Sequence, residues 1–284
     1  MFFALIAGAT ATAWPDDVDL TQLAYHNDSP VLDPAENVDD YRTVVQELGV
    51  AVANKPIAPA ETLGINGFEV GLATTIAFHS NKAPDFGVPS PWDRVDVDGD
   101  ARNALWIPWL MVRKGLPLST ELGVNLGWVG FSRQTVFGGY GRVAPLEGYK
   151  QAPDIAFQIG YAGYVGNDQL ELGAMDWSGT LSYSLPFGSL LGVNSASFSP
   201  FIGAGQVILH AEPKLASEVS QSLGVTPVSG FKNTEAYDPT DDAWRRARIH
   251  GGIRIVSRAF HFKLASTWTP QVMPEIHAGM GFTF

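Results

Sequence analysis

The ten C-terminal residues, 275–284, alternate strictly between apolar and polar side chains. The apolar positions are Ile276, Ala278, Met280, Phe282 and Phe284. Successive side chains on a β-strand point to opposite faces, so this segment predicts a strand with one apolar face and one polar, charged face. Such a strand has to lie between an apolar and a polar environment, which limits the folds that the chain can adopt.

Nine earlier segments also read as strands, most of them by the same alternation. They are 68–79, 104–114, 121–128, 134–145, 155–161, 175–183, 200–210, 248–255 and 260–268. No stretch approaches the ~18 consecutive apolar residues of a membrane helix. In lipid, only a closed barrel satisfies the backbone groups of every strand.

We therefore predict an all-β fold: a transmembrane antiparallel up-and-down β-barrel of about ten strands, with an N-terminal helix. The long gap at 185–199 leaves eight and twelve strands open, and a soluble β-sandwich is the alternative fold. If the chain enters the barrel from the periplasm, the two longest gaps, 80–103 and 211–243, both fall on the outer side. The last strand then ends at the periplasmic side.

The residues before the barrel differ from it in charge and in the spacing of their apolar residues. Residues 1–13 form an apolar run that ends in a small-x-small sequence, which is typical of a signal peptide, although no Lys or Arg precedes it. Residues 14–64 hold ten acidic residues against Arg42 and Lys55, a net charge of −8. Within this acidic segment, apolar residues at three- and four-residue spacing predict a helix over 33–54. Residues 65–284 would form the barrel.

The overall balance of charge excludes one class of partner. The chain has a net charge of −11, which argues against binding to nucleic acid. It also contains no Cys, so disulfides, thiolate metal sites and Cys nucleophiles are excluded.

The end of the chain resembles the C-terminal signature of Gram-negative outer-membrane β-barrel proteins, in which an amphipathic strand ends on an aromatic residue, here Phe284. The chain also resembles, across 47–284, a group of uncharacterised proteobacterial outer-membrane barrel proteins. The matching stretches are Glu47-Leu48-Gly49, Ala58-Pro59-Ala60-Glu61-Thr62-Leu63-Gly64 and Arg113-Lys114-Gly115-Leu116-Pro117. This resemblance implies a place in the cell outer membrane, contact with outer-membrane lipid and lipopolysaccharide, and insertion by the machinery that reads the terminal Phe284.

No catalytic motif accompanies the resemblance. The chain is too short for the larger fatty-acid transporter barrels. It offers no Ser, His and acid in an order that matches the outer-membrane phospholipase, and no pair of acidic motifs that matches the outer-membrane aspartyl-type proteases. The sequence therefore argues against an enzyme without excluding one, and it implies no organic cofactor.

Charged side chains gather on the polar faces of the predicted strands, where they would face the lumen. They are Glu69, Arg113, Glu121, Arg142, Asp176, Arg246, Arg248, His250, Arg254, His261, Lys263, Glu275 and His277. Charges in a narrow barrel would pair and fill its interior. The functional alternative is an anion-attracting lumen or pocket, because Arg forks suit carboxylates and phosphates.

The first long gap carries four carboxylates, Asp93, Asp96, Asp98 and Asp100. Carboxylates at this density can hold Ca²⁺ through oxygen ligands, although the spacing is not that of an EF-hand. The alternative is a solvated polar loop. His79 and His210 fall at the predicted outer ends of two strands, as rim residues or as parts of an outer-surface site.

Three functions remain open. The first is a small transport or solute-binding barrel, plugged by the helix 33–54 in the lumen or at its inner mouth, with the acidic helix face toward Arg246, Arg248 and Arg254. The second is a structural or interaction barrel that belongs to a larger envelope complex and docks a protein partner through acidic residues 14–54. The third is an outer-membrane enzyme that acts on lipid or peptide.

Overall fold

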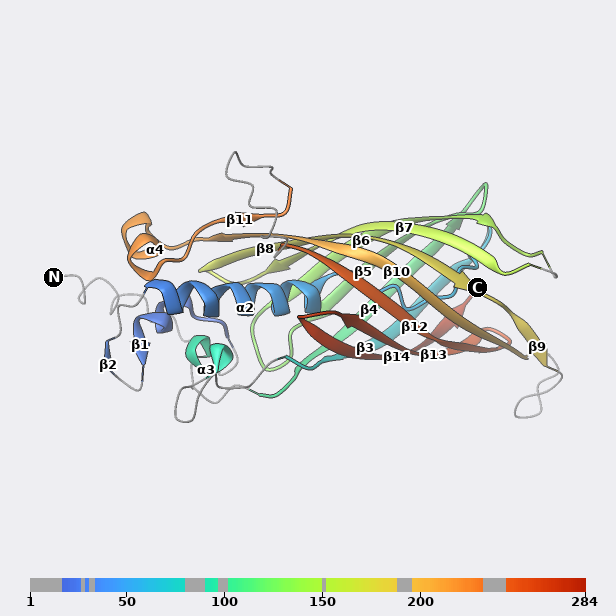
Figure 1. Cartoon of the computed structure of the whole chain (residues 1–284). Coiled ribbons are helices and arrows are strands. Elements are labelled where there is room, and N and C mark those ends of the chain that lie inside the picture. Colours follow the sequence, from blue (N-terminus) through green and yellow to red (C-terminus); the bar gives the residue numbers. More distant parts are fainter. Residues whose placement is uncertain are drawn as a thin grey trace.

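The fold is a closed antiparallel barrel of ten strands, which confirms the predicted fold class (Figure 1). The computed structural model describes residues 17–26, 29–30, 34–79, 90–96, 102–149, 152–187, 196–231 and 244–284, so the expected signal peptide at 1–13 lies outside it. The barrel strands are β3 (Phe68–Ala77), β4 (Leu105–Leu116), β5 (Thr120–Trp128), β6 (Thr135–Leu146), β7 (Asp154–Val165), β8 (Leu170–Ser182), β10 (Ala196–Pro213), β12 (Arg245–Ser257), β13 (Phe260–Thr269) and β14 (Met273–Thr283).

The first and last barrel strands close the sheet on itself. Strand β14 pairs with β3 from Glu275 opposite Ala77 to Thr283 opposite Glu69. Beyond the strands, the Phe68 amide donates to the Phe284 carbonyl at 3.0 Å, and the Phe284 amide donates to the Phe68 carbonyl at 2.7 Å. The terminal residue therefore completes the seam, and each of the ten strands has a partner on both sides.

The barrel is apolar outside, and its interior holds buried charged and polar side chains together with an apolar core around α2, unlike the interior of a water-soluble β-sandwich. On β5, Leu122, Val124 and Leu126 are 55%, 48% and 50% exposed, whereas Glu121 and Asn125 are 1% and 3% exposed. The same alternation places large apolar side chains on the outside of every barrel strand. A continuous apolar exterior of this kind is built to contact lipid. No helix in the described part of the chain is long and apolar enough to cross a membrane.

The two ends of the barrel differ in the length of their connections. The C-terminal end carries the connections 117–119, 147–153, 183–195 and 258–259, and the short strand β9 (Leu185–Phe187) pairs there with the start of β10. The opposite end, called the loop end below, carries the two longest connections, 78–104 and 214–244. These hold α3 (Pro91–Val95), α4 (Ser217–Leu223) and β11 (Val228–Ser229).

The N-terminal segment forms one long helix and then passes through the barrel. Helix α2 (Pro34–Val52) buries an apolar stripe that includes Tyr41, Val45 and Leu48. Before it lie the 3-10 helix η1 (Leu20–Ala24) and the two-residue strands β1 (Tyr25–His26) and β2 (Ser29–Pro30). Figure 1 shows α2 at the loop end with its C-terminal half directed into the barrel, and the C-terminus at the far end.

The location of α2 corrects one expectation from the sequence. The helix contacts α3 and α4 as well as β8 and β10. It therefore enters the lumen from the end opposite to the one where the last strand ends (Figure 1). Of the two expected placements, the one in the lumen agrees with this position, and the one at the mouth where the last strand ends does not. The chain then crosses the lumen between Ala53 and Gly67 to reach the start of β3 at the C-terminal end.

The apolar exterior allows a direct test of which side chains of a strand contact lipid. Leu264 lies in the middle of β13 and is 44% exposed, whereas Leu118, in a turn at the C-terminal end, is 92% exposed. Arginine at a lipid-facing position near the membrane midplane costs about 2–4 kcal/mol. We expect Leu264→Arg to lower the free energy of unfolding in lipid vesicles by about that amount, and Leu118→Arg to leave it nearly unchanged. Equal effects of the two variants would show that this face of β13 does not contact lipid.

Candidate functional site in the filled lumen

Asn54, the second residue after α2, is fitted into the barrel wall. Its Nδ2 donates to Asp176 Oδ1 at 3.0 Å and to the Gly139 carbonyl at 3.3 Å, while Asn125 donates to its Oδ1 at 3.1 Å. The wall is recessed at this point by glycines. A Cβ on Gly138 would lie 2.6 Å from Asn54 Oδ1, and a Cβ on Gly160 would lie 2.5 Å from Asn54 Nδ2.

An ion pair ties the next residue to the last strand. Lys55 Nζ lies 2.5 Å from Glu275 Oε1, and the two side chains are 4% and 0% exposed. Lys55 also donates to the Val50 carbonyl at 2.8 Å, which links the pair back to α2. Beside it, Arg248 donates to the Asn54 carbonyl at 2.9 Å and pairs with Asp176 at 3.0 Å. Buried charges require such partners, because an unpaired charge loses its hydration without compensation.

Further contacts hold the segment along the rest of the lumen. Arg142 donates to the Pro59 carbonyl at 2.9 Å and to Gln158 Oε1 at 2.8 Å. The Ala60 amide donates to Ser182 Oγ at 2.9 Å. The segment is therefore bonded to the wall on β6 and β8 as well as on β12 and β14.

The segment is also held where it leaves the lumen. The Thr62 amide donates to Glu147 Oε1 at 2.7 Å, in the turn between β6 and β7. This contact lies at the C-terminal end of the barrel, close to the start of β3.

A second charge cluster lies nearer the C-terminal end and centres on Glu69. Its carboxylate lies 2.6 Å from Lys263, 3.3 Å from Arg113 and 3.3 Å from Arg254. His261 lies 3.5 Å from the same carboxylate. Arg113 also pairs with Glu121 at 3.5 Å. The cluster thus contains three Lys and Arg side chains against two carboxylates.

Twelve of the thirteen charged or His residues singled out in the sequence are buried inside the barrel, in two groups. His250 bonds to Thr180 at 3.0 Å, and His277 bonds to Thr75 at 2.9 Å and to Thr267 at 2.8 Å, beside the Lys55 pair. Arg246 is the exception, because it lies at the mouth and donates to Gln46 of α2 at 3.0 Å.

The acidic side of α2 contacts the first long loop. Asp40 pairs with Arg94, and Glu47 accepts a hydrogen bond from Trp92 Nε1. Both partners belong to α3, and Asp39 is exposed. The expectation that this face would meet Arg246, Arg248 and Arg254 is therefore wrong.

Sequence reasoning missed Asn54, Lys55, Gln158, Ser182 and Glu147. Asn54 and Lys55 stand at the junction of the helix with Pro56, and they read as the polar end of the helix. The useful signal was composition: residues 53–60 are mostly Ala and Pro, a run that fits a narrow passage, and its two polar residues therefore needed partners.

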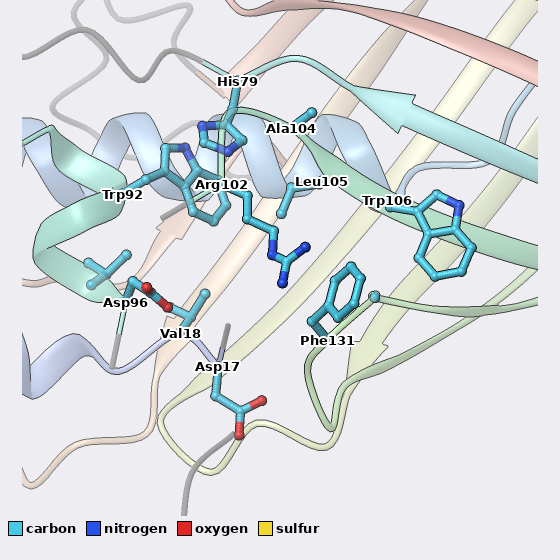
Figure 2. Close-up of a pocket in the computed structure, with 12 residues that line it drawn as sticks. Asp17, Val18, His79, Trp92, Asp96, Arg102, Ala104, Leu105, Trp106 and Phe131 are labelled. Carbon is cyan, nitrogen blue, oxygen red and sulfur yellow. The ribbon is translucent and has the colours of Figure 1, made fainter. Parts of the chain in front are cut away.

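A pocket at the loop end is the second candidate site (Figure 2). It has a volume of about 420 Å³ including its open mouth. Its twelve lining residues come from the N-terminal segment, from two loops and from the start of β4: Asp17, Val18, His79, Trp92, Val95, Asp96, Arg102, Ala104, Leu105, Trp106, Gly130 and Phe131. The guanidinium of Arg102 lies 3.7 Å from the centroid of the Phe131 ring, and the rings of His79 and Trp92 are 4.5 Å apart.

His79 is a buried titratable group in this pocket, as are Asp17 and Asp96. Burial lowers the pKa of His79 to about 4, although a backbone hydrogen bond with Arg102 opposes the shift, so the ring is neutral at pH 7. Its Nδ1 is buried without a hydrogen-bond partner among the described residues. His210, the other rim histidine, lies instead in β10 opposite Ser229 of β11.

Half of the predicted calcium site can be placed. Asp93 caps α3 by accepting bonds from the Ser90 amide and the Ser90 hydroxyl, and Asp96 lines the pocket. Asp98 and Asp100 lie outside the described residues. Within the described part of the chain, no group of three or more His, Cys, Asp or Glu side chains could hold a metal ion.

Comparisons with known proteins find similarity among solved structures and none by sequence. No sequence-family model and no curated protein matches the chain. Among solved structures, it is similar to a de novo designed transmembrane β-barrel, with 9% identity over 76% of this chain and 95% of the other, and a TM-score of 0.27. It is similar to Omp33 of Acinetobacter baumannii, with 9% identity over 78% and 99% and a TM-score of 0.26.

The transport unit of the Escherichia coli autotransporter AIDA-I is a third similar structure, with 9% identity over 87% of this chain and 97% of the other, and a TM-score of 0.30. At these identities and TM-scores, the similarity carries no argument about activity. The functional argument rests on the contacts within this chain.

The Lys55–Glu275 pair gives the second prediction. Breaking a buried ion pair by removing one partner typically costs about 3–5 kcal/mol, because the other charge stays buried and unpaired. We expect Lys55→Met to lower the free energy of unfolding by an amount of this size, measured by urea titration in lipid vesicles. The exposed pair Lys214–Glu171 is the control, and Lys214→Met should cost less than about 1 kcal/mol. Equal losses of unfolding free energy in Lys55→Met and Lys214→Met would contradict the claim that the Lys55–Glu275 pair holds residues 54–62 in the lumen.

The glycine recess gives the third prediction. We expect Gly160→Ala to lower the thermal unfolding midpoint, because the new Cβ would lie 2.5 Å from Asn54 Nδ2 and 2.9 Å from both the Gly139 carbonyl oxygen and Tyr140 Cβ. Gly141→Ala is the matched control on the same sheet, because its Cβ would find only Leu122 Cδ2, at 3.8 Å.

A double variant isolates the contact with Asn54. Asn54→Gly combined with Gly160→Ala should lose less stability than the two single losses added together, because the clash with Asn54 Nδ2 is then gone and only the contacts with Gly139 and Tyr140 remain. Strict additivity would mean that Asn54 does not occupy the recess.

Proposed function

We propose that this protein is an integral outer-membrane β-barrel whose lumen is kept closed by its own N-terminal segment, and that it has a structural or interaction role in the cell envelope. The observation that carries the proposal is the attachment of residues 54–62 to the wall. The Lys55–Glu275 ion pair holds it inside the barrel, together with the hydrogen bonds of Asn54 to Arg248 and Asp176. The recess formed by Gly138 and Gly160 fits the side chain of Asn54 in the wall.

The place of the barrel in the cell belongs to the same proposal. The apolar exterior supports contact with outer-membrane lipid and lipopolysaccharide. The terminal Phe284 supports recognition by the barrel insertion machinery, because it ends the strand that closes the seam. The acidic N-terminal residues 14–54 remain the proposed docking region for a partner.

A small plugged transporter is the second candidate, and the Glu69 cluster favours it. Three Lys and Arg side chains face two carboxylates there, so a lumen that opened would attract anions. Opening requires the Lys55 and Arg248 contacts to break. A transporter of this kind would be closed at rest. The full-length chain would conduct ions only during brief openings, when these contacts are broken.

Conductance in planar lipid bilayers separates the two candidates. We expect the full-length protein to add no current steps above the protein-free membrane, because the lumen is filled. A variant that lacks residues 34–62 loses that filling and, where it assembles, should give stepwise, anion-selective current. Frequent anion-selective openings of the full-length protein would contradict the closed barrel and favour transport.

A further inference from the structure

The chain N-terminal to the barrel and the C-terminus lie at opposite ends of the molecule. Phe68, at the start of β3, bonds to Phe284 at the C-terminal end. Residues 54–62 lie inside the lumen, and α2 contacts α3 and α4 at the loop end. Figure 1 shows α2 at one end of the barrel and the C-terminus toward the other.

The direction of this crossing follows from the connections. Barrels of the bacterial outer membrane have short turns on the periplasmic side and longer loops on the outer side. Here the longest connections, 78–104 and 214–244, lie at the end that α2 occupies. Phe284 and the turns 117–119 and 258–259 lie at the other end.

We infer that the barrel presents its own N-terminal segment on the outer face of the outer membrane, by way of its lumen. The inference rests on the proposed location in that membrane. It assigns the outer face, and not the periplasm, as the side on which a partner of the acidic segment would meet it.

The presented segment is attached to several outer loops. The Asp19 amide donates to the Val95 carbonyl at 2.8 Å, and Asn167, between β7 and β8, donates to the Val18 carbonyl at 2.9 Å. Asp17 accepts from the Arg133 amide, between β5 and β6, at 2.9 Å. Three connections thus hold residues 17–19 in place.

Because of these attachments, the N-terminal segment and the loops together form the outer surface. Asp17 and Val18 of this segment form one side of the pocket in Figure 2, and the exposed side chains of Arg102 and Phe131 at that pocket then face the external medium. A partner on this face would contact the N-terminal segment and the loops together.

Labelling of single cysteines on intact cells tests the inference, because the natural chain has none. Asp39→Cys places a thiol on the exposed side of α2, Glu218→Cys on α4, and Tyr149→Cys in the turn between β6 and β7. With a maleimide that cannot cross the outer membrane, we expect full labelling of Asp39→Cys and Glu218→Cys. Tyr149→Cys should react only after the outer membrane is permeabilised.

Two outcomes would overturn the inference. In the first, Asp39→Cys reacts only after permeabilisation, as Tyr149→Cys does, while Glu218→Cys reacts on intact cells. In the second, Tyr149→Cys is the variant that reacts on intact cells. Neither outcome depends on conductance. If the barrel conducts ions and Asp39→Cys still reacts on intact cells, the proposal of a closed lumen is wrong, and the inference that α2 lies on the outer face stands.

Discussion

The buried pairing of Lys55 with Glu275 is the interaction on which the interior depends. A barrel with an apolar exterior turns its polar side chains inward, and those charges must find partners in a narrow space. The wall supplies some of these partners itself, as in the Glu69 cluster. In the half of the lumen nearer the loop end, the partners come from the N-terminal segment, through the side chains of Asn54 and Lys55 and the Asn54 carbonyl. The N-terminal segment therefore fills the lumen and supplies the partners of the buried wall charges at the same time.

This arrangement explains why the ends of the molecule differ. The segment is bonded from Asn54 near α2 to Thr62 near β3, so the chain before Asn54 has to lie at the loop end. There α2 buries its apolar stripe against the barrel mouth and packs its acidic side against α3. The helix acts as a cap, and the extended segment below it holds the cap in place.

Sequence reasoning was sufficient for the barrel because each strand carries its own signal. Alternation on β5 and β14, for example, identifies the face toward lipid, and the ten segments recur as ten strands. The helix was also readable from its three- and four-residue spacing, with bounds of 34–52 against the expected 33–54. These features are local, so one short window of sequence contains each of them.

The threading of the segment has no local signal. Lys55 and Glu275 are 220 positions apart, and residues 53–60 have neither helical nor strand period. Nothing in such a run says whether the helix before it stays on the side where β3 begins or crosses to the other. The recess for Asn54 was equally hidden, because Gly138 and Gly160 read as ordinary glycines of curved strands.

A disulfide cross-link inside the lumen tests the central claim most directly. The Ala60 amide lies 2.9 Å from Ser182 Oγ, and the natural chain contains no Cys, so Ala60→Cys with Ser182→Cys offers one pair of thiols. The threaded segment predicts that mild oxidation of the folded barrel links these two residues within one molecule, and that neither thiol then reacts with maleimide. Two free thiols that both react quantitatively after oxidation, in a correctly folded barrel, would contradict it.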